Sequence, residues 1–183
     1  MDHKEYNTLF EEEFADPLKA LGFARVRKTR SLRYQNGTRD LWIRRVSSKW
    51  PHPGVAKTAI CFRHSFLRPV TCDDPDSDDL YMLDFPRVLR FEDFEGWLKP
   101  SPSYRPDITR REPSEFRYGD KGPDAVRKHL RRMRRLVDKR ILPWANGLTE
   151  EGELAQIIAF GQQLWCEKRW MEDYRHRLTE ARE

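Results

Sequence analysis

The residues best suited to chemistry in this 183-residue sequence are basic, and they are densest at residues 127–140, where eight Lys or Arg accompany one acid. Arginine forms paired hydrogen bonds with phosphate or carboxylate, so such a cluster can bind either kind of anion. No aromatic residue lies among these arginines to stack on a base, which counts against single-stranded nucleic acid. The candidate binding residues here are Arg127, Lys128, Arg131, Arg132, Arg134 and Arg135.

A second basic segment, residues 25–49, carries nine Lys or Arg against the single acid Asp40. It reads as paired strands, and we expect alternation to place Arg33, Arg39 and either Arg44 or Arg45 on a solvent face. Tyr34 and Trp42 are interleaved with these residues. A basic sheet face with aromatics can bind RNA, but the hydrophobic pattern favours core positions for both rings.

An acidic segment, residues 71–86, carries six Asp and no Lys or Arg. Asp74, Asp76 and Asp78 match the opening of a calcium-binding loop. The match then fails, because Asp79 replaces the glycine of the sharp turn and Phe85 stands where a bidentate glutamate belongs. We therefore expect an acidic loop that pairs with the basic surfaces, within the chain or in a partner.

No catalytic or metal motif is present. The five histidines lack metal-ligand spacing, and His64, which alternates with Phe62 and Phe66, is expected in the core. There is no nucleophile elbow and no glycine-rich phosphate loop. Asp40 with Glu167 and Lys168 could form a nuclease centre only by an arbitrary assembly. The sequence therefore predicts no catalytic residue, no metal and no cofactor.

The composition predicts a folded chain in a reducing compartment. Charged residues make up 36% of the sequence, but six Trp, six Tyr and ten Phe supply ample material for a core. The cysteines, Cys61, Cys72 and Cys166, are odd in number and far apart, which argues against a disulfide framework. No apolar run approaches the roughly 18 residues of a membrane span. We expect a cytoplasmic protein without a membrane partner.

The first half of the sequence predicts a helix and then a β-meander. An apolar stripe at helical spacing runs through residues 6–21, interrupted by Pro17 and stopped by Gly22. At Pro17 the helix either kinks or restarts with Asp16 as its cap. Asn36-Gly37 between two strand-like runs indicates a hairpin. A third apolar run spans residues 56–66.

The second half predicts mainly helices. Residues 87–98 read as a strand and a short helix, and residues 116–118 as a last strand. A helix from Pro123 to about Leu142 has a clean apolar stripe and is expected to end at Pro143. Thr149 starts another helix, and a helical, charged extension begins at about residue 165. The fold class is α+β: one domain over 1–183, with an N-terminal helix and two or three C-terminal helices on one face of an antiparallel sheet.

Two stretches together resemble a known family. Leu18-Lys19-Ala20-Leu21-Gly22-Phe23 precedes a basic segment and a hairpin that ends near residues 48–50. Ile141-Leu142-Pro143-Trp144 closes a long helix before a Thr-Glu-Glu helix start. Their order and spacing over roughly residues 6–160 resemble the domain of unknown function 4304 family of small bacterial proteins. The resemblance implies a leading helix, a meander and a trailing helix, and it implies no activity.

These patterns favour a non-catalytic bacterial protein that binds a protein partner through charged surfaces, as accessory or immunity-type proteins do. Nucleic-acid binding through residues 127–140 and 25–49 is the alternative, and an enzyme with a site in loops 69–86 and 99–123 is the third. The net charge of +5 conceals acidic and basic blocks of −5, +8, −6 and +7 at residues 1–16, 25–49, 71–86 and 127–140. Which blocks meet in the fold decides which surface remains open.

Overall fold

The sheet is antiparallel throughout and is organised around its longest strand, β4. A computed structural model describes residues 1–26, 31–45, 54–74, 77, 80–96, 113–161 and 164–181. The strand order is β1-β2-β3-β4-β5, and β6 pairs with another part of the β4 edge that β5 occupies. The strands are β1 Ala24–Arg25, β2 Leu32–Asn36, β3 Arg39–Arg45, β4 Val55–His64, β5 Arg87–Leu89 and β6 Ser114–Arg117.

The hairpin predicted from Asn36-Gly37 joins β2 to β3, with its turn one residue further along. Asn36 pairs with Arg39, so Gly37 and Thr38 form the two-residue turn. Gly37 has a φ of 58°, the left-handed conformation that glycine adopts without a steric penalty. Asn36 thereby stays in the ladder as the last residue of β2.

The helices begin where the sequence supplies caps. The Asp2 side chain accepts a hydrogen bond from the Glu5 amide at the start of α1, and the Thr149 side chain accepts one from the Gly152 amide at the start of α5. Gly22, at a φ of 91°, follows the end of the first helical segment, as predicted. The α-helices are α1 His3–Phe10, α2 Asp16–Lys19, α3 Pro123–Leu136, α4 Leu142–Asn146, α5 Glu150–Phe160 and α6 Trp165–Glu180. Two short 3₁₀ turns are η2 Met82–Asp84 and η3 Phe91–Phe94.

Both long helices run through a proline by way of a widened turn. A π-turn, η1 (Glu11–Ala15), joins α1 to α2 ahead of Pro17, and another, η5 (Val137–Ile141), joins α3 to α4 ahead of Pro143. Proline lacks an amide hydrogen and its ring crowds the carbonyl four residues back. A wider turn directly before it relieves that crowding. The prediction that Pro143 ends the helix is therefore wrong, because helical backbone continues to Asn146.

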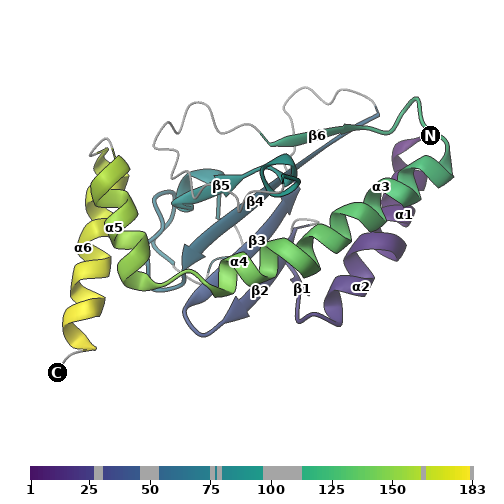
Figure 1. Ribbon diagram of the computed structural model, residues 1–183. Helices are drawn as coiled ribbons and strands as arrows, with labels where there is room; N and C mark the ends of the chain where they lie inside the picture. The colour runs from purple at the N-terminus through teal and green to yellow at the C-terminus, as the bar shows by residue number, and fades with distance from the viewer. Residues whose placement is uncertain are drawn as a thin grey trace.

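The main core lies between one face of the sheet and the helices α1 to α4. In Figure 1, α3 and α4 run along the sheet, with α1 and α2 beside α3. Fully burying one such aliphatic or aromatic side chain contributes roughly 1.5–3 kcal/mol. The core includes Leu41, Ile43, Ile60 and Phe62 from the sheet, Phe10, Phe14 and Leu18 from the first helices, and Val126, Leu130, Val137 and Ile141 from α3 and η5. The predicted α+β fold class is confirmed.

The opposite face of the sheet is covered by the described part of the acidic segment, residues 71–74, 77 and 80–86. Leu80 and Phe85 pack there against Trp42 and Cys61, and all four are fully buried. The Asp84 carboxylate, also buried, ties this segment down by accepting hydrogen bonds of 2.6–2.8 Å from the amides of Val70, Thr71 and Tyr81 and from the Thr71 hydroxyl. We call the two sides of the sheet the helix-covered face and the loop-covered face.

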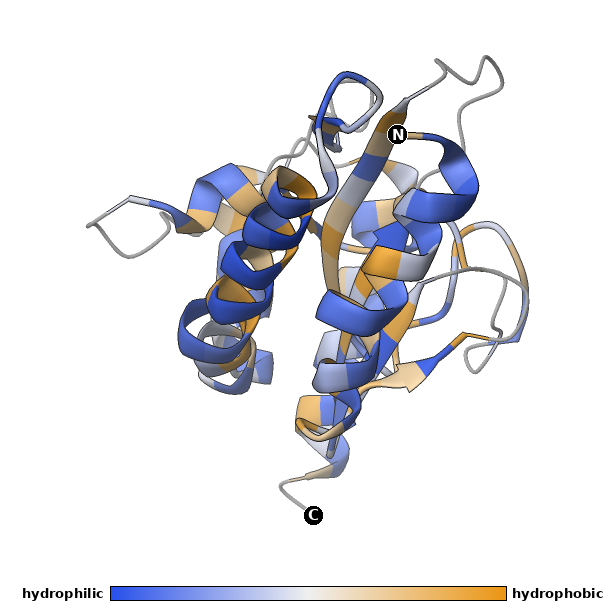
Figure 2. Ribbon diagram, turned by 90° about the vertical axis from the view of Figure 1, so that its right-hand side faces the viewer, coloured by the Kyte–Doolittle hydropathy of each residue, from blue (hydrophilic) through white to orange (hydrophobic). Residues whose placement is uncertain are grey.

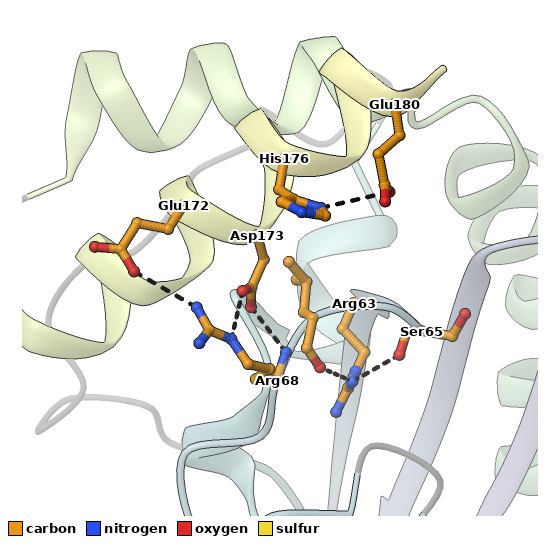
Figure 3. Close-up of polar contacts among 8 residues, drawn as sticks. Arg63, Ser65, Arg68, Glu172, Asp173, His176 and Glu180 are labelled. Carbon is orange, nitrogen blue, oxygen red and sulfur yellow. Dashed lines mark hydrogen bonds and ion pairs between the residues drawn. The ribbon is translucent and has the colours of Figure 1, made fainter. Parts of the chain in front are cut away.

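Helices α5 and α6 pack against each other at the end of the sheet away from α1 (Figure 1). Arg87 of β5 holds α5 through a buried, two-pronged pair with Glu153, at 2.7 and 2.8 Å. Figure 3 shows the exposed counterpart on α6, where Asp173 accepts hydrogen bonds from the Arg68 backbone amide and guanidinium. Polar contacts therefore supplement the small apolar cluster that joins α5 and α6 to the rest of the chain.

The buried pair predicts a large effect of one substitution. Glu153→Gln should lower the free energy of unfolding by about 3 kcal/mol, because it leaves the Arg87 charge in a buried site without its opposite charge. Urea denaturation would measure the loss. The exposed Glu151→Gln on the same helix is the control and should change stability by less than about 0.5 kcal/mol. Equal stability of the two variants would contradict this account of the pair.

Candidate functional site

The basic cluster of α3 forms one exposed strip along the helix. Val126, Leu130 and Met133 are buried and fix which side of α3 faces the core. Figure 2 shows that hydrophilic residues make up most of this helix, with the apolar positions recurring at intervals. Five cations at three- and four-residue steps occupy the outer side and line a shallow groove of about 450 Å³, together with Asp124. We call them the α3 ridge: Arg127, Lys128, Arg131, Arg134 and Arg135.

The α3 ridge is short, and acids stand at both ends of it. Its residues, 127 to 135, span about 12 Å at the rise of an α-helix. Asp124 pairs with Arg127 at 3.3 Å before the ridge, and Asp138 pairs with Lys139 at 2.9 Å after it. Among the described residues of this helix, the ridge is therefore a compact cationic patch with an acid at each end.

An acid from another helix reaches into the ridge. Glu13, on the π-turn η1, accepts two hydrogen bonds from Arg131, at 2.7 and 2.8 Å, and lies 3.7 Å from the Arg127 guanidinium. The hydrogen bond from Arg131 holds the pKa of the Glu13 carboxyl below its ordinary value, and the pair raises the pKa of Arg131. On the other flank, Arg132 pairs with Glu95.

The remaining ridge cations face solvent. Lys128, Arg134 and Arg135 form no hydrogen bond or ion pair with any residue that the structure describes. Lys128 and Arg135 are exposed, and Arg134 is half-buried. Three cations, one near the start of the ridge and two at its end, are thus available to an anion from outside the chain.

The basic strand residues do not extend the ridge. Arg33 and Arg44 lie on the loop-covered face with Trp42, whereas Arg39 and Arg45 lie on the helix-covered face. The prediction that Arg33, Arg39 and Arg44 or Arg45 share one solvent face is wrong. Arg33 pairs with Trp42 and shares its face, whereas Arg39 lies three positions from Trp42 on the same strand and therefore points to the other side. Trp42 is fully buried and Tyr34 packs against the main core, so both rings are core residues, as favoured.

Three of these strand arginines bind groups inside the fold. Arg33 forms a two-pronged pair with buried Asp40, at 2.8 and 2.9 Å. The Arg39 guanidinium donates to the Leu148 carbonyl. Arg45 donates to the Asn7 side chain. Their charges serve the fold rather than an open surface.

The acidic segment, residues 71–86, does not reach the α3 ridge in the described part of the chain. It covers the loop-covered face, whereas α3 lies across the helix-covered face. Asp73 and Asp74 are exposed, and Asp76, Asp78 and Asp79 fall outside the described residues. The predicted pairing of this segment with the basic residues of α3 is therefore not found among the described residues, where Glu13 and Glu95 are the acids that pair with Arg131 and Arg132.

The candidates for catalysis lie in structural roles. Asp40 accepts hydrogen bonds from Arg33 and the Trp42 indole, and Glu167 accepts one from the Leu164 amide at the start of α6. His64 is buried, with its Nδ1 2.8 Å from the Tyr174 hydroxyl, as expected for a core histidine. Within the described residues, no cluster of three or more His, Cys, Asp or Glu side chains could hold a metal ion.

The three cysteines are not joined in a disulfide. Cys61 and Cys166 are buried and Cys72, in the acidic segment, is partly exposed. Among the described helices, none combines the length and apolar character needed to cross a bilayer.

Comparison with known proteins returns no match to a protein-family model, to a curated protein or to a solved structure. The resemblance to the domain of unknown function 4304 family therefore stays a prediction. The site has to be interpreted from its own geometry.

Burial of two histidines predicts a pH dependence of stability. Burial lowers the pKa of His64 to about 4, and burial beside Arg132 lowers that of His129, stacked on Phe116, to about 4. Both side chains bind a proton near pH 6.5 only when unfolded. Their contribution to stability is thus complete above about pH 6.5 and is lost as the pH falls towards 4.

Urea denaturation at several pH values would measure this effect. Each histidine should add up to about 1.4 kcal/mol per pH unit to the slope within that window. His64→Gln should flatten the slope relative to that of the wild type. An unaltered slope in His64→Gln would show that this side chain is not buried in its neutral form.

Proposed function

We propose that this protein is a non-catalytic binding module that docks an acidic surface of a protein partner on the α3 ridge. The observation that carries the proposal is that exposed Lys128 and Arg135 and half-buried Arg134 have no ion-pair partner among the described residues and lie beside Arg127 and Arg131 on one side of one helix. Like charges this close repel one another, so the arrangement favours association with a complementary anionic surface.

A protein partner fits the dimensions of the ridge better than a nucleic acid does. A duplex presents phosphates continuously, and proteins that bind it usually neutralise several of them. The α3 ridge spans about 12 Å, has Asp124 and Asp138 at its ends, and is not extended by the strand arginines. A compact group of carboxylates on a protein matches this footprint.

We propose more specifically that this is an accessory or immunity-type protein, which acts by covering a surface of its partner. Complementary charge would speed the encounter and select the partner, and apolar contacts around the ridge would supply part of the affinity. Nucleic-acid binding is the alternative outcome that the test must distinguish.

Removing the open charges tests the proposal. The triple variant Lys128→Gln, Arg134→Gln, Arg135→Gln should bind the partner roughly tenfold more weakly or worse, since each exposed charge contact contributes up to about 1 kcal/mol. The matched control is Lys4→Gln, Lys168→Gln, Arg175→Gln, which removes three exposed cations elsewhere on the described surface. Immobilised wild type and both variants would be exposed to an extract of the organism that carries the gene.

The bound material would then be identified with and without nuclease treatment. The proposal predicts a protein that the wild type and the control capture, that the ridge variant loses, and that nuclease treatment does not release. Equal capture by both variants would contradict the assignment of the ridge. Recovery of nucleic acid alone would replace the protein partner with the alternative.

A further inference from the structure

An acid of the same chain, Glu13, already binds part of the α3 ridge. Both carboxylate oxygens of Glu13 bind Arg131, and one lies 3.7 Å from Arg127. Arg131 is also the central residue of the ridge, since Arg127, Lys128, Arg134 and Arg135 all lie three or four positions from it. A ligand that approaches the centre of the ridge therefore contacts Glu13 before it can bind Arg131.

One guanidinium edge can hold one carboxylate in the two-pronged geometry. Glu13 uses the Nε and Nη2 hydrogens of Arg131, which form that edge. A second anion can take the same edge only by displacing Glu13. The pair lies at the surface, with the Arg131 side chain 55% exposed and the Glu13 side chain 15% exposed, and ion pairs at the surface contribute little to stability, so displacement costs little.

We propose that the partner docks by carboxylate exchange, in which an acidic side chain of the partner takes the place of Glu13 on Arg131. This inference rests on the proposed function and adds two features to it. Glu13 becomes the residue that sets the strength of docking. The partner must present at least two carboxylates about one helical turn apart, one for Arg131 and one for the open Arg134, Arg135 or Lys128.

The arrangement favours a carboxylate over a phosphate as the exchanging group. Glu13 shows that the Arg131 edge and the approach beside η1 accommodate a carboxylate with hydrogen bonds of 2.7 and 2.8 Å. Arg132, which could have widened the patch on the other flank, is taken by Glu95. Once Glu13 has left, the ridge offers the guanidinium edge of Arg131 that Glu13 occupied and three separate cations. Side-chain carboxylates spaced along a partner can match this pattern.

The test uses the full-length protein and a fluorescein-labelled oligoglutamate peptide, followed by fluorescence anisotropy at low salt. Glu13→Gln keeps the size of the side chain and removes its charge. It should bind the peptide about fivefold more tightly than the wild type, the gain expected when an exposed ion pair no longer competes. Glu151→Gln changes the net charge equally at an exposed position on α5 and should produce a clearly smaller gain.

A double-variant cycle identifies the atom group involved. In an Arg131→Gln background, Glu13→Gln should give no more gain than Glu151→Gln, because the edge that Glu13 guards is gone. A Glu13→Gln gain no larger than that of Glu151→Gln would overturn carboxylate exchange. A loss of affinity would overturn it too and would make Glu13 a positioning residue that holds Arg131 ready.

The same experiment separates this inference from the proposed function. One outcome is that the wild type binds the peptide, the Lys128, Arg134 and Arg135 triple variant does not, and Glu13→Gln brings no specific gain. That outcome would support the ridge as the docking site and would contradict only carboxylate exchange. If the triple variant binds the peptide as tightly as the wild type does, both the proposed docking on the ridge and carboxylate exchange are contradicted. A labelled duplex DNA, run in parallel, should gain less from Glu13→Gln than the peptide does; an equal gain would overturn the preference for carboxylate.

Discussion

Helix α3 can bury only one of its sides, and that constraint shapes the whole charged surface. Val126 and Leu130 of α3, and Val137 at the start of η5, enter the main core with Leu41 and Phe62 of the sheet. Each is fully buried, so rotating the helix would expose apolar surface and bury guanidinium groups at a cost that the fold could not recover. The orientation of the ridge towards solvent follows from this packing and not from any attraction between the arginines, which repel each other.

The same two-sided architecture determines where the other charge blocks lie in the fold. The described part of the acidic segment is held on the loop-covered face by Asp84, so the sheet separates it from α3. The acidic block at the N-terminus lies beside α3, because α1, η1 and α2 share the helix-covered face with it (Figures 1 and 2). Glu13 therefore neutralises part of the ridge, and Arg33, Arg39 and Arg45 bind groups inside the fold. Within the ridge, the cations without an ion pair to a described residue are Lys128, Arg134 and Arg135.

Local features of the sequence predicted the elements well, because caps, turns and apolar stripes act over a few residues. Thr149, Gly22 and the hairpin at Asn36-Gly37 are examples, and the stripe of α3 already indicated which side would be exposed. Pro143 does not end its helix, since a π-turn lets the helix pass it, and such a turn has no simple signature in residue type or spacing. Strict alternation across the hairpin would have separated Arg33 from Arg39. The contact between Glu13 and Arg131 joins positions 118 residues apart, and only the fold brings them together.

The central claim is that the guanidinium groups of α3, and not those of the strands, bind the partner. Proton–nitrogen NMR of the arginine side chains observes these groups directly, since each Nε–H gives its own signal. On titration with the captured partner, the signals of Arg131, Arg134 and Arg135 should shift, while those of Arg33 and Arg39 should stay in place. Shifts confined to Arg33, Arg39 and Arg45 would contradict the account.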